Sequence, residues 1–331
     1  MKKISLIILF LSAMHATQAS SQNLFPLLGG QRIGTAAATF LKIDVGAEAT
    51  AMGGAAVALA SDASTLYWNP AAAAQLAKNS LSVSHIEWPV DIQYEYLGYV
   101  HHLNRLGTLG ISCGMLHMAD MEVTTEYHPT GNGEYFHYQD SFMALTYALK
   151  MTDRFSFGTS MKYVEENMAG IKMGGWMVDF GTYYWTGFRN LRFAVSLVNF
   201  GPDMRPDGRY LRENQDGGID EKKYESFSPP TTFRVGSAMD IYHVDLYRVG
   251  VAFQINHPVD NAENAVLGLD FQMHEILTLR GGYRINYDEE NFTFGAGFLF
   301  FITGRKLSLD YAFKDFSTLS TTHQFSLGFQ F

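Results

Sequence analysis

The residues whose types could bind a metal lie in an aspartate-rich stretch near the middle of the chain. Residues 203–220 contain Asp203, Asp207, Asp216 and Asp220, and carboxylate oxygens are ligands that Ca²⁺ prefers. Their spacing does not match the calcium loop of an EF-hand. A solvated loop explains the same residues, so we predict no metal site here.

The histidines and the cysteine do not form a catalytic set. His101 and His102 are adjacent, so in a strand their side chains point to opposite faces. The eleven histidines show no metal-ligand spacing, and no nucleophile motif or glycine-rich phosphate loop occurs. Cys113 is the one cysteine, which excludes an internal disulfide, and we expect it to pack within a strand. We predict neither an enzyme nor a bound cofactor.

The elements that carry these residues are strands, as the end of the chain shows. Within residues 321–331, Phe325, Leu327, Phe329 and Phe331 alternate with polar residues or glycine. A two-residue period gives a strand one apolar and one polar face. A chain that ends on such an aromatic strand is similar to the closing strand of bacterial outer-membrane barrels.

Alternating runs of about 9–13 residues continue through the chain from Ser80 onward, and this length suits a tilted strand that crosses a bilayer. We therefore predict an all-β fold, a transmembrane antiparallel β-barrel of about 14 strands. The predicted strands are residues 80–88, 92–103, 106–118, 139–150, 154–164, 175–186, 190–200, 231–242, 245–256, 263–272, 276–287, 291–302, 305–315 and 321–331.

Connection lengths support the barrel independently. Turns that follow even-numbered strands are short, and most of those that follow odd-numbered strands are long, although residues 89–91 form a short one. Short periplasmic turns and long outer loops are the rule for bacterial barrels. The predicted long loops are residues 119–138, 165–174, 201–230, 257–262 and 316–320.

Charged residues fall on the polar face of these strands, which a barrel turns toward its lumen. Their signs are mixed, so we expect them to pair with one another and with a plug rather than to select ions. This face also gives no continuous apolar tunnel. The residues are Arg192, Arg234, Arg248, Arg280, Arg284, Asp179, Asp240, Asp270 and Asp310.

The first residues predict export. Lys2 and Lys3 precede an apolar run, and small residues follow up to Ala19, as in a secretory signal peptide. We predict that residues 1–19 are a signal peptide, cleaved near Ala19 after Sec export, and that the chain resides in the bacterial outer membrane. The formal net charge of −9 argues against nucleic acid as a partner.

Residues 20–79 lack the strand pattern and are rich in alanine and glycine. Small side chains suit a segment packed in a confined space, so we expect a hatch or plug with short helices inside a barrel formed by residues 80–331. Asn69 and Pro70 suit the N-cap and first position of a short helix that continues over residues 71–77.

Four segments carry a likeness to a known family: residues 40–72, 256–271, 279–298 and 309–316, with DASTLYWNPAA at 62–72 as the most specific part. On these segments the chain resembles the PorV/PorQ family, which belongs with the FadL-type fourteen-stranded barrels. FadL-type proteins also carry an Asn-Pro-Ala element in their N-terminal hatch. The hatch motif implied by this resemblance is Asp62, Trp68, Asn69 and Pro70.

The resemblance also implies a non-enzymatic docking or shuttle role in type IX protein secretion. Outer loops of a barrel surrounded by membrane lipid would receive cargo proteins from the secretion translocon and pass them on. Exposed loops on a rigid scaffold commonly carry binding sites. The candidate partner-binding residues in loops 119–138 and 201–230 are Tyr127, Tyr135, Phe136, Tyr210 and Arg212.

Two other hypotheses remain open at this stage. A FadL-like transporter of hydrophobic small molecules, gated by a hatch of residues 35–79, would hold lipid or detergent in a pocket against the hatch. A purely structural barrel, with a hatch that binds no ligand, would neither bind lipid there nor capture secretion components.

Overall fold

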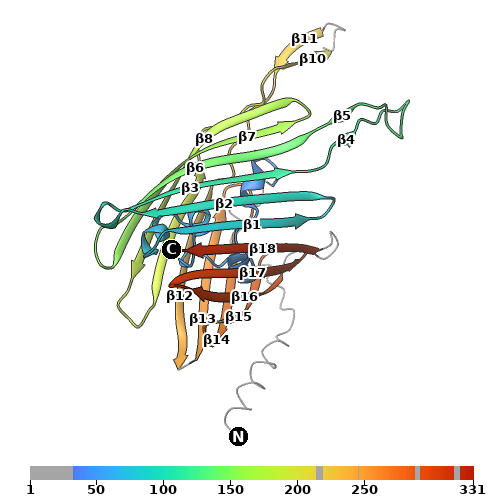
Figure 1. The fold of residues 1–331 in the computed structure, drawn as a ribbon. Helices are drawn as coiled ribbons and strands as arrows, with labels where there is room; N and C mark the ends of the chain where they lie inside the picture. The colour runs from blue at the N-terminus through green and yellow to red at the C-terminus, as the bar shows by residue number, and fades with distance from the viewer. Residues whose placement is uncertain (1–32, 214–218, 245, 288–290, 317–320) are drawn as a thin grey trace.

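The chain folds as a closed antiparallel β-barrel (Figure 1), which confirms the predicted fold class. The computed structural model describes residues 33–213, 219–244, 246–287, 291–316 and 321–331, so the predicted signal peptide lies outside the described residues. The barrel strands are β1 (Ser80–Trp88), β2 (Ile92–His102), β3 (Thr108–His117), β6 (Tyr138–Lys150), β7 (Phe155–Met168), β8 (Ile171–Trp185), β9 (Arg192–Phe200), β12 (Thr232–Val244), β13 (Tyr247–Pro258), β14 (Asn264–Met273), β15 (Leu277–Ile285), β16 (Phe292–Ile302), β17 (Arg305–Asp315) and β18 (Thr321–Gln330).

The barrel closes where the last strand meets the first. β18 pairs with β1 in a ladder that runs from Ser80 opposite Gln330 to Glu87 opposite His323. Closure matters because an open sheet edge would leave backbone groups without partners in lipid. No described helix is long and apolar enough to cross a membrane.

The two faces of the strands differ as the alternation predicts. In β18, Phe325 and Leu327 are exposed on the outside, whereas Gln324 and Ser326 are buried on the inside. Large apolar side chains cover the outer face of the other strands as well, which suits contact with lipid. Cys113 lies within β3, but on this exposed outer face.

One predicted long loop is wrong. Residues 165–174 are not a loop, because β7 and β8 continue as a paired ladder to Met168 opposite Ile171, with Ala169 and Gly170 as the turn. Polar residues on both faces hid this extension from the alternation pattern. Lys172 and Glu165, for example, form an exposed ion pair at 3.0 Å.

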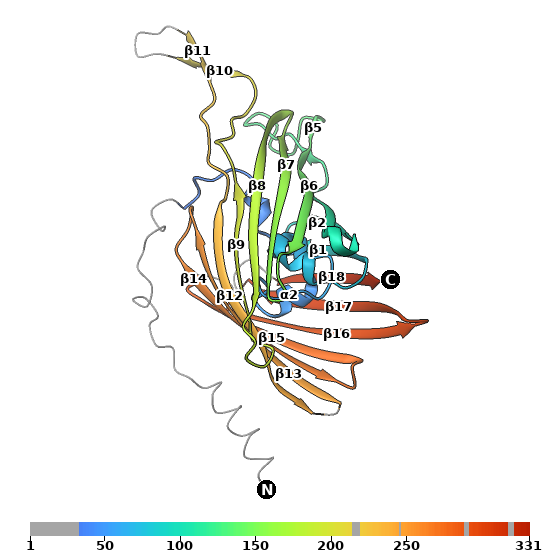
Figure 2. The same ribbon diagram turned by 90° about the vertical axis from the view of Figure 1, so that its left-hand side faces the viewer.

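Two other long connections form hairpins that project from the same end of the barrel (Figures 1 and 2). β4 (Met121–Glu122) pairs with β5 (Tyr135–Phe136), and β10 (Arg209–Glu213) pairs with β11 (Ile219–Lys223). We call this end of the barrel the long-loop end and the opposite one the short-turn end. At the short-turn end, the connection from β2 to β3 carries the short helix η4 (Asn104–Leu106).

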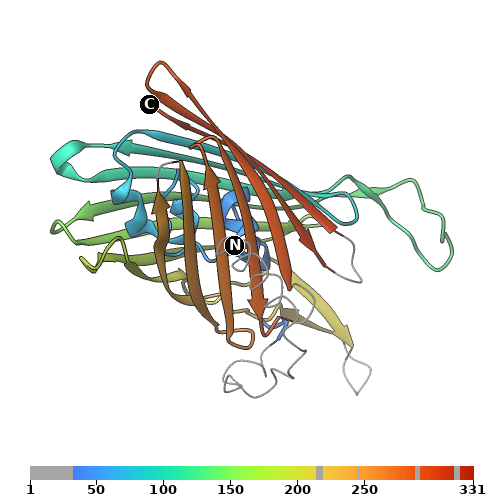
Figure 3. The same cartoon turned by 90° about the horizontal axis from the view of Figure 1, so that it is seen from below.

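The first described residues of the chain, up to the start of β1, lie inside the ring of strands (Figure 3). We call described residues 33–79 the hatch. Near the long-loop end, the Ala37 N–H donates to the Ser228 carbonyl at 2.9 Å, and the hatch ends where β1 begins, at the short-turn end. Its helices are η2 (Thr39–Lys42), α2 (Ala47–Ala51), α3 (Thr65–Trp68) and η3 (Pro70–Gln75).

Glycines on the inner face of the strands let the hatch backbone approach the wall. A Cβ on Gly158 would lie 2.5 Å from the Ala71 nitrogen, and one on Gly282 would collide with the backbone of Met52 and Gly53. The wall is therefore shaped to receive this segment. Further inner glycines closely approached by the hatch are Gly98, Gly110, Gly181, Gly236, Gly268 and Gly295.

Candidate functional site

Asn69 of the hatch motif is fully buried and fixes the local fold. Its side-chain oxygen accepts the Ala71 N–H at 3.0 Å and so caps η3, in which Pro70 is the first residue. Its amide donates to the carbonyls of Val57 at 3.0 Å and Thr182 at 3.1 Å. These bonds tie the helix cap both to the rest of the hatch and to β8.

Trp68 is also buried and packs within the hatch. Its indole N–H donates to the Val45 carbonyl at 2.8 Å, and its ring meets Tyr67 edge-to-face at 5.1 Å. The guanidinium of Arg234, on β12, lies 5.0 Å from the Trp68 ring centre. This contact connects the hatch to the barrel wall by a cation–π interaction.

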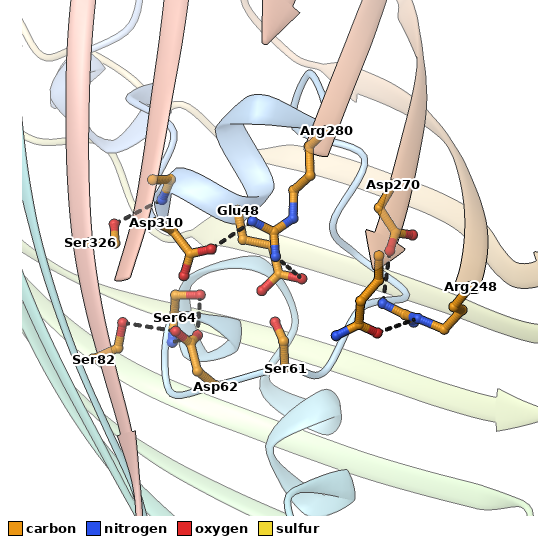
Figure 4. Close-up of polar contacts among 12 residues, drawn as sticks. Glu48, Ser61, Asp62, Ser64, Ser82, Arg248, Asp270, Arg280, Asp310 and Ser326 are labelled. Atoms are coloured by element: carbon orange, nitrogen blue, oxygen red, sulfur yellow. Dashed lines mark hydrogen bonds and ion pairs between the residues drawn. The ribbon is translucent and has the colours of Figure 1, made fainter. Parts of the chain in front are cut away.

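Asp62 makes its polar contacts with other residues, Ser64 and Ser82 (Figure 4). Its Oδ1 accepts the N–H and the hydroxyl of Ser64 at 2.8 and 2.6 Å, and its Oδ2 accepts the Ser82 hydroxyl at 3.2 Å. Burial raises the pKa of Asp62, although the bonds from Ser64 oppose the rise. The structure thus brings Trp68, Asn69 and Pro70 together but not Asp62.

A cavity of about 360 Å³, which we call the inner cavity, lies between the hatch and the short-turn ends of the strands from β9 to β18. Its charged groups pair as expected for mixed signs (Figure 4). Arg280 contacts Asp310 at 2.6 Å and Glu48 of the hatch at 3.5 Å. Arg248 contacts Asp270 at 2.8 Å. Burial would raise the pKa of Glu48, but Arg280 reverses the effect and lowers it.

A second cavity, the outer cavity, lies between the hatch and the wall toward the long-loop end and measures about 280 Å³. Asp44 of the hatch lines it and pairs with Arg284 of β15, and it also lies 3.7 Å from Lys314 of β17. Burial would raise the pKa of Asp44, but these two cations together lower it. The hatch therefore separates two polar cavities.

The hatch meets two different walls. The inner face of β1–β8 packs against it through an apolar and aromatic cluster, whereas the inner face of β12–β17 combines small apolar contacts with ion pairs to Asp44 and Glu48. Added salt screens the ion pairs of the second wall. The wall residues of the apolar cluster are Ile86, Tyr94, Tyr96, Leu116, Phe142, Ala144, Val164 and Met177.

The candidate partner-binding residues lie on the two projecting hairpins and do not form one site. Tyr127 is 89% exposed and Tyr135 60% exposed on the β4–β5 hairpin, next to the partly buried Phe136. On the β10–β11 hairpin, Tyr210 packs on Tyr224 at 5.4 Å. Arg212, on the same hairpin, is exposed.

Several residues of this arrangement escaped the sequence analysis. Asp44 and Glu48 anchor the hatch to the charged wall, and acidic residues in an alanine-rich segment opposite a set of lumen arginines could have signalled this. Leu211 and Ile219 are 72% and 70% exposed on the β10–β11 hairpin. Met204 lies in a predicted outer loop but is buried against Gly175, which no sequence pattern indicates.

Within the described part of the chain, no group of three or more histidine, cysteine, aspartate or glutamate residues is placed to hold a metal ion. Of the aspartates considered above as calcium ligands, Asp216 lies outside the described residues.

Comparisons with known proteins agree with this geometry. The family model described as type IX secretion system protein PorV matches residues 29–261. The Pseudomonas putida toluene transporter TodX has a similar structure, with a TM-score of 0.57 and 13% identity over 86% of this chain and 96% of TodX. The CymD monoaromatic hydrocarbon channel has a TM-score of 0.55 and 14% identity over 92% of this chain and 97% of CymD. A Pseudomonas aeruginosa FadL homologue has a TM-score of 0.52 and 11% identity over 87% of this chain and 98% of the homologue. At these identities the structural likeness shows the fold alone. No curated protein matches the chain.

Proposed function

Because this outer-membrane β-barrel belongs to the PorV family of type IX secretion system proteins, we propose that it is a non-enzymatic docking or shuttle component for secreted cargo proteins. In this role, the long-loop end of the barrel receives cargo from the secretion translocon and passes it to the next component. The partners and the direction of transfer are part of the proposal, as are Sec export and the cleavage of a signal peptide near Ala19.

The observation that carries the proposal is the contrast between exposed hairpins and a filled lumen. Tyr127 and Tyr135 on one hairpin, and Leu211 and Ile219 on the other, expose large apolar side chains beyond the barrel. Exposed apolar and aromatic groups on a rigid scaffold are typical of protein-binding surfaces. We assign cargo or translocon contact to these two hairpins.

The alternative is a FadL-like transporter of hydrophobic small molecules. The fold is that of hydrocarbon channels, which is the observation in its favour. The cavities beside the hatch are small and rich in charged and amide groups, however, and transport pockets for hydrophobic molecules are predominantly apolar. The polar cavities therefore favour the docking role over transport.

The experiment removes the gene and restores either the natural chain or a variant in which residues 209–223 are replaced by a short Gly-Ser linker. This replacement leaves Met204, Phe227 and Ser228, which join the loop base to the barrel and the hatch, in place. Loss of cargo from the cell surface without the gene, and its recovery with the natural chain, is the expected result. Unchanged cargo secretion combined with impaired uptake of a hydrophobic compound would replace docking by transport.

A further inference from the structure

The outer cavity is built from the hatch on one side and strand ends on the other. Its lining includes Gly53 and Gly54 of the hatch, and Trp88, Pro258 and Tyr287 at or just beyond the long-loop ends of their strands. A small molecule arriving at the long-loop end would reach this cavity before the hatch.

Basic groups outnumber acidic groups around the outer cavity. Among its described lining residues, Asp44 is the one carboxylate, and it is shared between Arg284 and Lys314. Lys42 pairs with Asp260 just outside the lining at 2.6 Å, so the surplus lies with the arginines and Lys314. The inner cavity differs, because its described lining carries equal numbers of acidic and basic residues. The basic residues that line the outer cavity are Lys42, Arg234, Arg284 and Lys314.

Among the described lining residues of this cavity, Arg234 has a buried side-chain nitrogen without a hydrogen-bond partner. The residue is 7% exposed, and its guanidinium lies between 5.0 and 5.4 Å from the ring centres of Trp68 and Tyr67. Its Nη1 is buried and has no hydrogen-bond partner within the described residues. A buried charged donor without an acceptor is costly, so its presence beside a cavity indicates that an acceptor binds there.

We propose that the outer cavity binds a small organic carboxylate, with the carboxylate oxygens on the guanidinium of Arg234. Arginine suits this task because its planar fork of N–H donors matches a carboxylate. The surplus of positive charge attracts the anion from the long-loop end.

The remainder of the cavity selects for a compact, flat ligand. The rings of Trp68, Trp88 and Tyr287 provide flat apolar surfaces, and amide side chains at Gln254 and Asn264 provide polar ones. A volume of about 280 Å³ admits a molecule of benzoate size. This inference does not depend on the secretion role.

Calorimetric titration with benzoate tests the proposal. The sample is the purified full chain in detergent micelles. Benzyl alcohol serves as the neutral probe of nearly the same shape. We expect saturable binding of benzoate and none of benzyl alcohol, and we expect benzoate binding to weaken as salt is added. Arg234→Gln should weaken benzoate binding roughly tenfold or more, because a charge-assisted contact is lost.

The matched control is Arg192→Gln. Arg192 also lies over a tryptophan, 5.8 Å from the ring centre of Trp185, but lines the inner cavity on the other side of the hatch. This variant should bind benzoate like the natural chain. If Arg234→Gln fails to fold, Arg234→Lys, which keeps the charge but not the fork, should show intermediate binding.

Absence of saturable benzoate binding would overturn the proposal. So would equal binding of benzyl alcohol, or an Arg192→Gln variant that loses as much affinity as Arg234→Gln. The comparison of the two probes on the natural chain decides the matter even if no arginine variant folds.

Discussion

The interior of the barrel and its two projecting hairpins use the same residue types in opposite ways. Inside, the side-chain oxygen and amide of Asn69 form hydrogen bonds within the fold, and Arg280 lies between two carboxylates. On the β10–β11 hairpin, Arg209 and Glu221 form a pair in which both side chains are more than half exposed, and Leu211 contacts solvent. These interior groups are bonded within the fold, and these hairpin groups are exposed to solvent.

This difference separates stability from recognition within one chain. Substitutions inside should affect folding of the barrel, and similar substitutions on the hairpins should leave folding unchanged. Pairs of matched variants can therefore test each half of the comparison.

The largest effect is expected at Gly282, where the wall meets the hatch backbone. The Gly282→Val side chain would collide with the backbone of Met52 and Gly53. The hatch could then not pack against the wall, so we expect loss of the folded barrel. The neighbouring Gly281 is the control, since a Cβ there meets nothing closer than 3.9 Å. Gly281→Val should retain the folded band that unheated samples give in denaturing gels. A folded Gly282→Val variant would show that the hatch is not fitted to this wall.

Next in size is a comparison of two ion pairs. Asp310→Ala leaves Arg280 buried with a weakened set of partners and should lower the free energy of unfolding by about 3–5 kcal/mol. Glu221→Ala removes the partner of Arg209 on the β10–β11 hairpin and should cost less than ~1 kcal/mol. Urea unfolding in lipid vesicles measures both. Equal costs would contradict the distinction between interior and hairpin.

A similar comparison applies to two asparagines. Asn69→Ala removes a helix cap and leaves the carbonyls of Val57 and Thr182 without their amide donor, with an expected cost of about 3 kcal/mol. Asn132→Ala, on the β4–β5 hairpin, loses two exposed bonds to Glu134 and should change stability by about 0.5 kcal/mol or less. The same unfolding assay measures both variants. An Asn69→Ala variant with an unchanged free energy of unfolding would show that Asn69 does not anchor the hatch.

The smallest effect concerns pH. Burial raises the pKa of Asp62 above its ordinary value of 3.8, so the folded chain holds this proton more tightly than the unfolded chain. The stability that Asp62 contributes is complete below pH 3.8 and is lost as the pH rises through the raised folded pKa. Asp62→Asn removes this loss, so its stability relative to the natural chain should increase as the pH rises above 3.8.

Asp44→Asn should change the pH dependence of stability in the opposite direction. The pKa of Asp44 is lowered by Arg284 and Lys314 despite its burial, so its stabilising contribution is present above pH 3.8 and lost below it. Unfolding free energies measured across this range check both variants. The same pH trend in the two would contradict the assignment of different surroundings to the two carboxylates.

Local patterns predicted the barrel better than they predicted the hatch. Alternation in strands such as β18 reports which face meets lipid, because the bilayer imposes one rule on every strand. The alternation does not predict the extension of β7 and β8, because this hairpin carries polar residues such as Glu165 and Lys172. Both of its faces meet water, so neither face needs to be apolar. The cap at Asn69 was predictable because a cap is local.

The pairing of Asp44 with Arg284 joins residues 240 positions apart, so no local pattern contains it. The outer cavity likewise depends on where the hatch lies against β12–β17. The same holds for Met204, whose burial depends on how the loop base folds back against β8. These features depend on tertiary packing, which a single sequence does not report.

The projecting hairpins are expected to carry the contact with secretion partners. Affinity capture from mild-detergent outer membranes, followed by mass spectrometry, tests it with the natural chain, the variant lacking residues 209–223 and Asn132→Ala as the matched hairpin control. We predict that the natural chain and Asn132→Ala recover a large translocon barrel or secreted cargo proteins, and that the shortened variant recovers neither while remaining folded. Equal recovery by the shortened variant, or recovery of the barrel alone with bound lipid, would contradict the claim.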